Sequence, residues 1–199
     1  MRIPLILRAD SYKYSHFRLF PKGATNNFSY VESRGIDEDS DLPQDAEIVF
    51  FGPQMWIAEY LLTRVTMEDI NRAEALIPAH GLPFNRHDWE IIVDEYDGFL
   101  PLEIKALPEG SIIKPHTMMS CVVATDDRFA WLASFIETQM IRAIWYPTTV
   151  ATVSREAKKI IRRYLNRTSD DPQGQIPFKL HDFGARGTSS GESASIGGL

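Results

Sequence analysis

Hydrophobic residues in the first half of the chain recur at three- and four-residue steps, the spacing that one face of an α-helix requires. The clearest stripe of this kind runs through residues 54–65. Thr66 followed by Asp69 has the pattern of a capping box, so a second helix is predicted to begin there. Asn85 is placed to cap a third helix, and Gly98 stands where that helix would end. The pattern therefore predicts consecutive helices up to Gly98.

Short apolar or alternating runs, which are typical of β-strands, lie on both sides of these helices. One run covers residues 26–33, and an acidic stretch over 35–47 connects it to the first helix. After the third helix, the runs 100–107, SIIK and TMMSCVVA follow one another with proline and glycine between them. We predict a β-rich segment in this part of the chain.

The second half of the chain returns to helical spacing. Residues 126–146 predict a long and mostly buried helix, which Pro147 should break. A further helix is predicted over 148–166 with its basic residues facing outward, and residues 176–183 read as a strand. The residues expected to face inward on the helix over 148–166 are Val150, Val153, Ile160, Ile161 and Leu165.

Helices that lead into a buried strand and a glycine-rich segment are typical of an α/β fold with ligand chemistry at the end of the strand. We expect an α+β N-terminal domain over 1–98 and the start of a second domain over 99–199, because the pattern changes after Gly98. The glycine-rich end, GARGTSSGESASIGG, matches neither common phosphate-loop fingerprint. Its position after a predicted strand, rather than a motif, marks it as a candidate site.

The composition and charge of the chain argue against several classes of protein. The chain is 44% hydrophobic and 24% charged, close to the average of soluble domains. Its net charge of −6 argues against nucleic-acid binding as the main role, since phosphate backbones require clustered cations. The basic residues that do cluster are interpreted as the solvated face of a helix and are Lys158, Lys159, Arg162 and Arg163.

The expected location follows from two further features of the sequence. No apolar run approaches the ~18 residues that a bilayer-spanning helix needs. The single cysteine, Cys121, cannot form an internal disulfide and gives no sign of secretion. We expect a cytoplasmic protein that does not act at a membrane.

The candidate chemistry near the end of the chain has two interpretations at each position. Arg186, between Gly184 and Gly187, either binds a phosphate through its guanidinium or caps carbonyls of its own loop. Phe183 either stacks on a flat ring or belongs to the core. The residues alone leave both questions open.

Near the N-terminus, the stretch ADSYKYSHFRLFP contains Asp10 and Tyr12. A helix cap at Asp10 or Ser11, opening an amphipathic helix, explains these residues without any function. The histidines show no metal-ligand spacing, so no metal site is predicted; they are His16, His80, His87, His116 and His181.

Several stretches together resemble the N-terminal part of the nicotinamide phosphoribosyltransferase family, whose chains are much longer than this one. They occur in the family's order and spacing across nearly the whole chain. The matching stretches are ADSYKYSHFRLFP, SYVESRG, VFFGPQMWI, YDGFLPLEIKALPEG, WLASFIET, WYPTTVATVSRE and KLHDFGARG. The resemblance implies that the α+β portion is followed by the first elements of an irregular α/β barrel of the nicotinate/nicotinamide phosphoribosyltransferase type.

The resemblance also implies roles for individual residues. Tyr12 and Phe183 look like the two aromatic faces that sandwich a pyridine ring, with Tyr12 supplied by the other subunit of a homodimer. Arg186 looks like a ligand of the diphosphate, and Arg34 like a phosphate contact across the dimer interface. Asp10 looks like a polar member of the nicotinamide end of the pocket.

The implied reaction joins nicotinamide to phosphoribosyl pyrophosphate, with Mg²⁺ on the diphosphate and ATP as an activator. Ala185 departs from the family, which carries an aromatic residue there, and this departure concerns the packing of the loop. The family's phosphorylated histidine and carboxamide-binding aspartate lie downstream of the IGG stretch. No catalytic residue is therefore assigned, and the 199 residues alone are expected to be inactive.

Two alternatives stand beside this interpretation. The substrate is nicotinate instead of nicotinamide, or the chain is a truncated, non-catalytic paralogue that binds a partner. The carboxylate that would distinguish the two substrates lies outside the chain.

Overall fold

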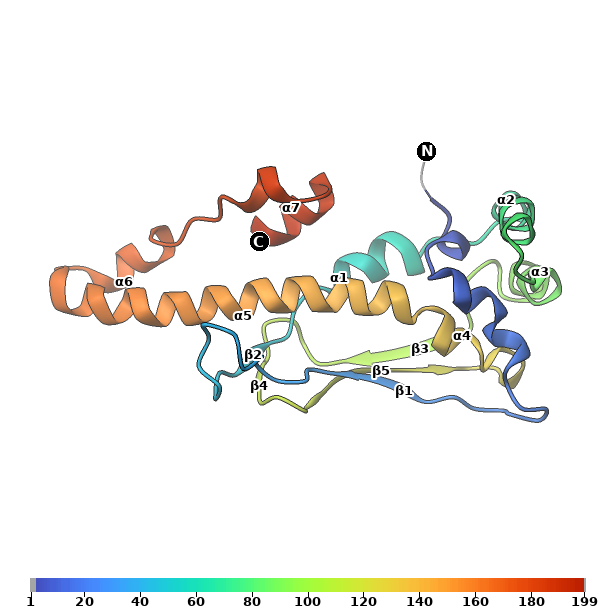
Figure 1. Ribbon diagram of the computed structural model, residues 1–199, viewed down its shortest axis with the longest axis horizontal. Helices are drawn as coiled ribbons and strands as arrows, with labels where there is room; N and C mark the ends of the chain where they lie inside the picture. Colours follow the sequence, from blue (N-terminus) through green and yellow to red (C-terminus); the bar gives the residue numbers. More distant parts are fainter. Residues whose placement is uncertain (1–2, 199) are drawn as a thin grey trace. The chain divides into compact units, whose positions relative to one another are not determined.

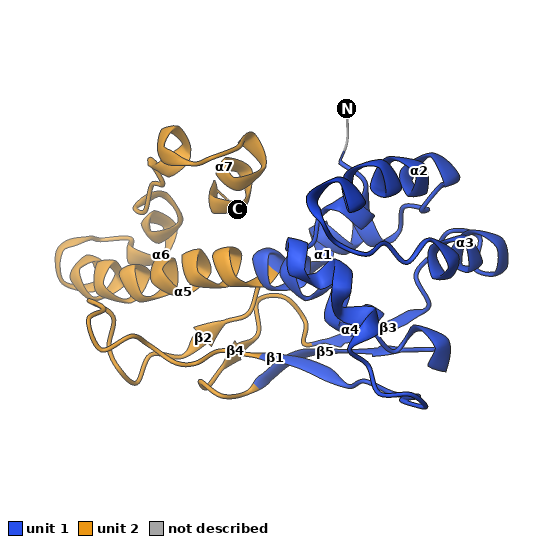
Figure 2. Cartoon of the chain, turned by 45° about the vertical axis from the view of Figure 1, so that its right-hand side comes forward, with its two compact units in different colours: residues 1–31, 53–106, 118–143 blue, residues 32–52, 107–117, 144–199 orange. Residues whose placement is uncertain are grey.

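The computed structural model describes residues 3–198, which form a mixed α/β structure (Figure 1). The chain divides into two compact units that interleave along the sequence (Figure 2). Unit 1 consists of residues 1–31, 53–106 and 118–143, and unit 2 of residues 32–52, 107–117 and 144–199. These units group residues by contact, so the domain boundary expected near Gly98 stays a prediction.

Unit 1 contains a three-stranded sheet in the order β1-β5-β3. Strands β3 (Leu102–Ala106) and β5 (Met118–Ala124) pair antiparallel, and β1 (Ser29–Glu32) lies on the other side of β5. All three strands fall inside runs that the sequence predicts as strands. The β-rich segment after residue 100 is therefore confirmed.

The helices of unit 1 follow the predicted order up to residue 95. Helix α1 (Pro53–Trp56) continues into one π-helical turn (Ile57–Leu61), and α2 (Met67–Leu76) and α3 (Arg86–Glu95) follow. The unit also has short 3-10 helices, which are η1 (Leu5–Leu7), η2 (Ser11–Arg18), η4 (Pro78–His80) and η5 (Asp127–Phe129).

The capping box at the start of α2 is confirmed. The Asp69 backbone N–H donates to Thr66 Oγ1 at 3.2 Å, and the Thr66 N–H donates to Asp69 Oδ2 at 3.0 Å. Asn85 stands at the N-cap position of α3, but its side chain makes no capping bond. Its amide instead donates to Asp88 Oδ2 at 2.6 Å, which also accepts from Trp131 Nε1.

Three aromatic side chains form the centre of the unit 1 core. Trp89, Trp131 and Phe135 meet edge to face, with ring centroids 5.3–5.6 Å apart. This is the arrangement that aromatic quadrupoles favour. The cluster joins α3 to α4 (Leu132–Phe135), the element that faces the N-terminal segment described below.

Gly98 gives a direct test of local geometry in unit 1. Its φ is +79°, and a Cβ built on it would lie 2.4 Å from the Val65 carbonyl oxygen. We predict that Gly98→Ala lowers the free energy of unfolding by about 3 kcal/mol, through the left-handed backbone and the clash with a carbonyl. Urea unfolding measures this.

Gly81→Ala is the matched control for Gly98→Ala. Gly81 has φ +84°, but its Cβ would meet nothing within 4 Å. Gly81→Ala should therefore lower the free energy of unfolding by about 1 kcal/mol, the cost of a left-handed backbone alone. Equal losses in the two variants would contradict the predicted clash.

The helix predicted over 126–146 is interrupted, and the break predicted at Pro147 is wrong. Asp126 caps the 3-10 turn η5, α4 is a single turn, and α5 then runs from Glu137 to Thr168 through Pro147. An internal proline costs about 3 kcal/mol because one hydrogen bond is lost. The Pro147 side chain is fully buried, so its packing offsets part of this cost.

The buried face of α5 in unit 2 is partly polar. The inward position expected for Val153 and Ile160 is wrong, whereas Val150, Ile161 and Leu165 are half-buried. Val153 and Ile160 are 45% and 61% exposed, whereas Thr152 is buried. The reason lies in the strand edge beneath the helix. The Phe51 N–H donates to Thr148 Oγ1 at 3.2 Å, and the Val49 N–H donates to Thr152 Oγ1 at 3.0 Å. These hydroxyls satisfy buried backbone donors that apolar side chains would leave unpaired.

Unit 2 has a small sheet and several short helices. Strands β2 (Ile48–Val49) and β4 (Ile112–Ile113) pair antiparallel. The remaining elements are α6 (Pro172–Gln175), η6 (Ile176–Phe178), η7 (Gly184–Gly187) and α7 (Gly191–Gly198).

The strand predicted over 176–183 is wrong. Residues Ile176–Phe178 form a 3-10 turn, and residues 179–183 have no regular structure. A strand needs a neighbour to satisfy its backbone groups, and no strand within residues 3–198 pairs with this segment. Pro177 also lacks a backbone donor.

Within residues 3–198, no helix is long and apolar enough to cross a bilayer.

Candidate functional site

Asp10 lies just before the 3-10 helix η2 in unit 1, and its side chain reaches helix α5 rather than capping η2. Thr138 Oγ1 donates to Asp10 Oδ2 at 2.9 Å, and the Asp10 N–H lies 3.3 Å from the same hydroxyl. The Asp10 side chain makes no capping bond to η2, although the Asp10 carbonyl accepts from the Lys13 N–H at 2.9 Å. A simple cap therefore does not explain this residue, whose exposed carboxylate is held in place from α5.

Lys13 links η2 to the rest of unit 1 through polar contacts. Its side chain is 4% exposed and forms an ion pair with Glu137. Its Nζ also donates to Ser134 Oγ at 3.3 Å, and His16 Nδ1 lies 3.3 Å from the same hydroxyl. Burial and the Lys13 charge lower the pKa of His16 below its usual 6.5, partly opposed by Glu137. His16 is therefore neutral at pH 7.

Tyr12 presents an open aromatic surface next to these groups. The ring centroid of His16 lies 5.0 Å from that of Tyr12 at 61°, and Lys13 Nζ lies 5.2 Å from the Tyr12 centroid. The Tyr12 side chain nevertheless remains 52% exposed. A flat ligand has room to stack on it.

Phe183 and Arg186 lie together in unit 2 on the loop that begins η7. Asp182 Oδ1 accepts from the Gly184 N–H at 2.6 Å, which fixes the turn between them. Phe183 is 83% exposed, so it does not belong to the core formed by residues 3–198. Arg186 is exposed and forms no ion pair within residues 3–198. Both side chains are free to meet a ligand.

Arg34 lies in unit 2 directly after β1 and is also exposed. Gly35 follows it with φ +100°, and Pro115 lies against that glycine. No hydrogen bond or ring contact in the described part of the chain joins Arg34 to Phe183 or Arg186. Asp10 and Tyr12 are neighbours in the sequence, as are Phe183 and Arg186, and no described contact joins the members of either pair or the two pairs to each other.

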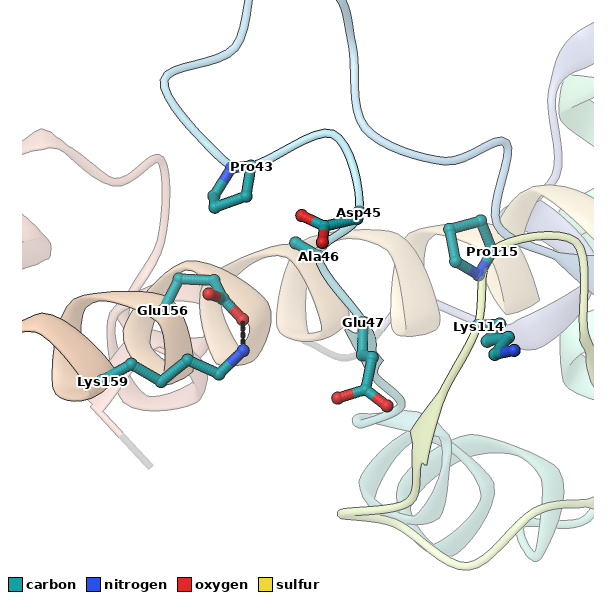
Figure 3. Close-up of a pocket in the computed structure, with 8 residues that line it drawn as sticks. All are labelled: Pro43, Asp45, Ala46, Glu47, Lys114, Pro115, Glu156 and Lys159. Atoms are coloured by element: carbon teal, nitrogen blue, oxygen red, sulfur yellow. Dashed lines mark hydrogen bonds and ion pairs between the residues drawn. The ribbon is translucent and has the colours of Figure 1, made fainter.

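A pocket of about 730 Å³ in unit 2 was not predicted from the sequence (Figure 3). Its charges are largely paired within the protein. Lys159 Nζ donates to Glu156 Oε1 at 2.6 Å, and Arg155 bridges Glu156 at 3.1 Å and Glu47 at 2.8 Å. Its lining includes Asp45 and Glu47 from the acidic stretch over 35–47 and Lys159 from the basic cluster of α5, which the sequence analysis had interpreted as an exposed connection and a solvated helix face. Lys114 and Asp45 also line the pocket without a described ion pair, and this one cation and one anion define no ligand chemistry by themselves.

The most perturbed carboxyl group lies outside any pocket given above. Arg128 and the Tyr96 hydroxyl hold the pKa of Asp126 well below its usual range, and Arg128 also pairs with Glu95 at 2.6 Å. These groups lie at the surface of unit 1, where ion pairs are screened by water. We interpret them as a structural network. Among residues 3–198, no group of three acidic, histidine or cysteine side chains is arranged to hold a metal.

Sequence reasoning missed Lys13 and Glu137. Lys13 stands between two tyrosines in the stretch YKYSH, where a polar residue is expected on the solvated face of an amphipathic helix. The detectable signal was a lone lysine in an otherwise aromatic run. Its partner is more than a hundred residues away in the sequence, so no local pattern joins the two.

Comparisons with known proteins agree on one family. Residues 4–104 match the profile described as the nicotinamide phosphoribosyltransferase N-terminal domain. The nicotinamide phosphoribosyltransferase of Xanthomonas campestris is 48% identical over 194 residues, covering 98% of this chain and 40% of the relative. The protein of the same name from Acinetobacter baylyi is 30% identical over 209 residues, covering 100% of this chain and 41% of the relative.

Among solved structures, the chain is similar to human nicotinic acid phosphoribosyltransferase. The TM-score is 0.52 at 16% identity, and the match covers 78% of this chain and 29% of the human chain. At this identity the likeness concerns the fold alone. The chain thus spans about two fifths of the length of the curated relatives it matches, at 40% and 41%.

Proposed function

Because the chain belongs to the nicotinamide phosphoribosyltransferase family, we propose that it forms the N-terminal part of an enzyme of NAD salvage. The enzyme condenses nicotinamide with 5-phosphoribosyl 1-diphosphate to give nicotinamide mononucleotide and diphosphate. The observation that carries the proposal is the 48% identity to a relative of this name over 98% of the chain. The relatives' greater length supports a longer whole protein.

The reaction is a displacement at the anomeric carbon of the ribose. The lone pair of the pyridine nitrogen forms the new N–C bond, while the C–O bond to the diphosphate breaks and its electron pair leaves with the diphosphate. The neutral ring thereby becomes a pyridinium cation, and the leaving group gains negative charge. Groups that stabilise these charges more in the transition state than in the ground state raise the rate.

Five exposed side chains are given roles in this proposal. Tyr12 and Phe183 stack on the two faces of the nicotinamide ring, with Tyr12 given by the second subunit of a homodimer. Arg186 binds the diphosphate through its guanidinium, and Arg34 contacts a phosphate across the dimer interface. Asp10 forms part of the polar end of the ring pocket. Support comes from the exposure of these five side chains and from the hydroxyl that holds Asp10.

Mg²⁺ is expected to arrive with the diphosphate, whose developing charge it neutralises. ATP is proposed as an activator that acts through residues outside this chain. The segment over 99–199 is proposed to begin an irregular α/β barrel, supported by the likeness to the human nicotinic acid enzyme. We place the enzyme in the cytoplasm, since a single cysteine gives no sign of secretion.

Nicotinate is the alternative substrate, and a fold likeness to the human nicotinic acid enzyme is consistent with either substrate. Nicotinamide is preferred because an acidic residue in the pocket, expected beyond this chain, would repel a carboxylate substrate and accept a hydrogen bond from an amide. The sequence relatives at 48% and 30% identity carry the nicotinamide name.

The test is formation of nicotinamide mononucleotide from nicotinamide, phosphoribosyl pyrophosphate and Mg²⁺. The full-length protein should form it, and the 199 residues alone should not, because part of the pocket lies beyond them. Synthesis by the 199 residues alone would overturn the second expectation.

A further inference from the structure

The buried charge of Lys13 requires compensation, and Glu137 provides it. The Lys13 side chain is 4% exposed, while that of Glu137 is 54% exposed. A buried ammonium without a partner is costly, so removal of the carboxylate would leave a strongly unfavourable charge. The pair joins η2 to the first turn of α5 within unit 1.

The same lysine lies beside the ring that is proposed to meet the substrate. Lys13 Nζ is 5.2 Å from the Tyr12 centroid. Asp10 adds a second carboxylate on this side of unit 1, held by Thr138. The neighbouring His16 is neutral at pH 7 because burial and Lys13 lower its pKa. Asp10, Lys13 and Glu137 together therefore carry one net negative charge.

The sign of this charge matters for the reaction, because the ring changes charge as it reacts. Nicotinamide is neutral when it binds, whereas the ring of nicotinamide mononucleotide is a cation. A Lys13 ammonium without its carboxylate would repel the cation while affecting the neutral ring little. The negative charge of Glu137 offsets the Lys13 ammonium and so removes this repulsion.

We propose that Glu137 is a positioning residue that acts through Lys13, so that the Tyr12 face of the ring site accepts the positive charge gained by the nicotinamide ring. This inference rests on the proposed function, and it assigns Glu137 no contact with the substrate. It predicts a selective effect on charged ligands, which a purely structural role of the ion pair would not produce.

Glu137→Gln is the first variant, because it removes the charge and keeps the shape. An unpaired ammonium about 10 Å from a stacked pyridinium should weaken its binding about tenfold at an effective dielectric constant of about 20. The double variant Lys13→Met/Glu137→Gln removes both charges with a side chain of similar length and should restore the binding of the cation. Glu103→Gln is the matched control, since Glu103 is 50% exposed and pairs with Lys105 at the surface.

The experiment is calorimetric titration of the full-length protein and its variants with nicotinamide and with nicotinamide mononucleotide, together with steady-state kinetics. Glu137→Gln should raise the Kd of nicotinamide mononucleotide about tenfold and change the Kd of nicotinamide less than about twofold. It should also lower kcat without raising the KM for nicotinamide. Glu103→Gln should have the same ratio of the two Kd values as the wild type. The double variant should restore that ratio. Equal weakening of both ligands, no weakening of either, or a double variant that stays selective against the cation would overturn the inference. A wild-type protein that binds neither ligand would instead contradict the proposed function.

Discussion

Replacing Arg186 by alanine should raise the KM for phosphoribosyl pyrophosphate by about a hundredfold, since a hydrogen-bonded ion pair with phosphate is worth about 3 kcal/mol. The side chain is exposed and forms no ion pair within residues 3–198, so the fold should not depend on it. The thermal midpoint of Arg186→Ala should therefore equal that of the wild type. Steady-state kinetics with the full-length protein at saturating nicotinamide measures the KM.

Two further variants show whether Arg186 binds the diphosphate specifically. Arg186→Lys keeps the charge but loses the planar fork, so it should recover only part of the loss. Arg163→Ala removes another exposed arginine of the same unit and should leave the KM unchanged. A KM that shifts equally in Arg163→Ala and Arg186→Ala would mean that general positive charge, rather than this guanidinium, attracts the substrate.

Replacing Phe183 by alanine should raise the KM for nicotinamide about thirtyfold and leave the KM for phosphoribosyl pyrophosphate unchanged. The loss combines about 1 kcal/mol of aromatic stacking with about 1 kcal/mol of apolar surface that the ligand no longer covers. Phe183 is 83% exposed, so its removal leaves no cavity in the core. Initial rates at varied nicotinamide measure the effect.

Phe178→Ala is the control for Phe183→Ala, because Phe178 is 72% exposed in the same unit and lies five residues earlier in the chain. It should leave both KM values unchanged. If Phe178→Ala and Phe183→Ala weaken nicotinamide equally, loss of local order rather than stacking causes the change.

Elements whose cause is local were predicted correctly. The capping box of Thr66 and Asp69 needs only two side chains three residues apart, and both hydrogen bonds are present. Strands β3 and β5 lie in apolar runs with turns on either side, and these runs were recognised. In these cases the residues that cause the structure are close together in the sequence.

Elements that depend on distant partners were predicted wrongly. Pro147 continues the helix because packing around its buried ring outweighs a local rule. Thr152 faces inward because a strand more than a hundred residues earlier offers it a donor. Residues 176–183 have the composition of a strand, but no strand among residues 3–198 pairs with them. In none of the three cases did the local sequence decide the structure.

The candidate site divides in the same way. Arg186 was a candidate because the glycines around it allow close approach to a ligand, whereas Phe183 received a role only from the family resemblance; both are exposed. Asp10 and Tyr12 also received their roles from the resemblance, because their residues alone are explained by a helix cap. The structure adds their contacts with α5 and His16. Lys13 and Glu137 could not be paired from the sequence at all.

The most direct measurement is a competition assay in which the full-length protein receives equal nicotinamide and nicotinate with phosphoribosyl pyrophosphate and Mg²⁺. Chromatography separates the two mononucleotide products. We expect nicotinamide mononucleotide in at least about tenfold excess, corresponding to about 1.4 kcal/mol of discrimination by a carboxylate in the pocket. An excess of nicotinate mononucleotide, or no mononucleotide of either kind, would contradict the proposed enzyme.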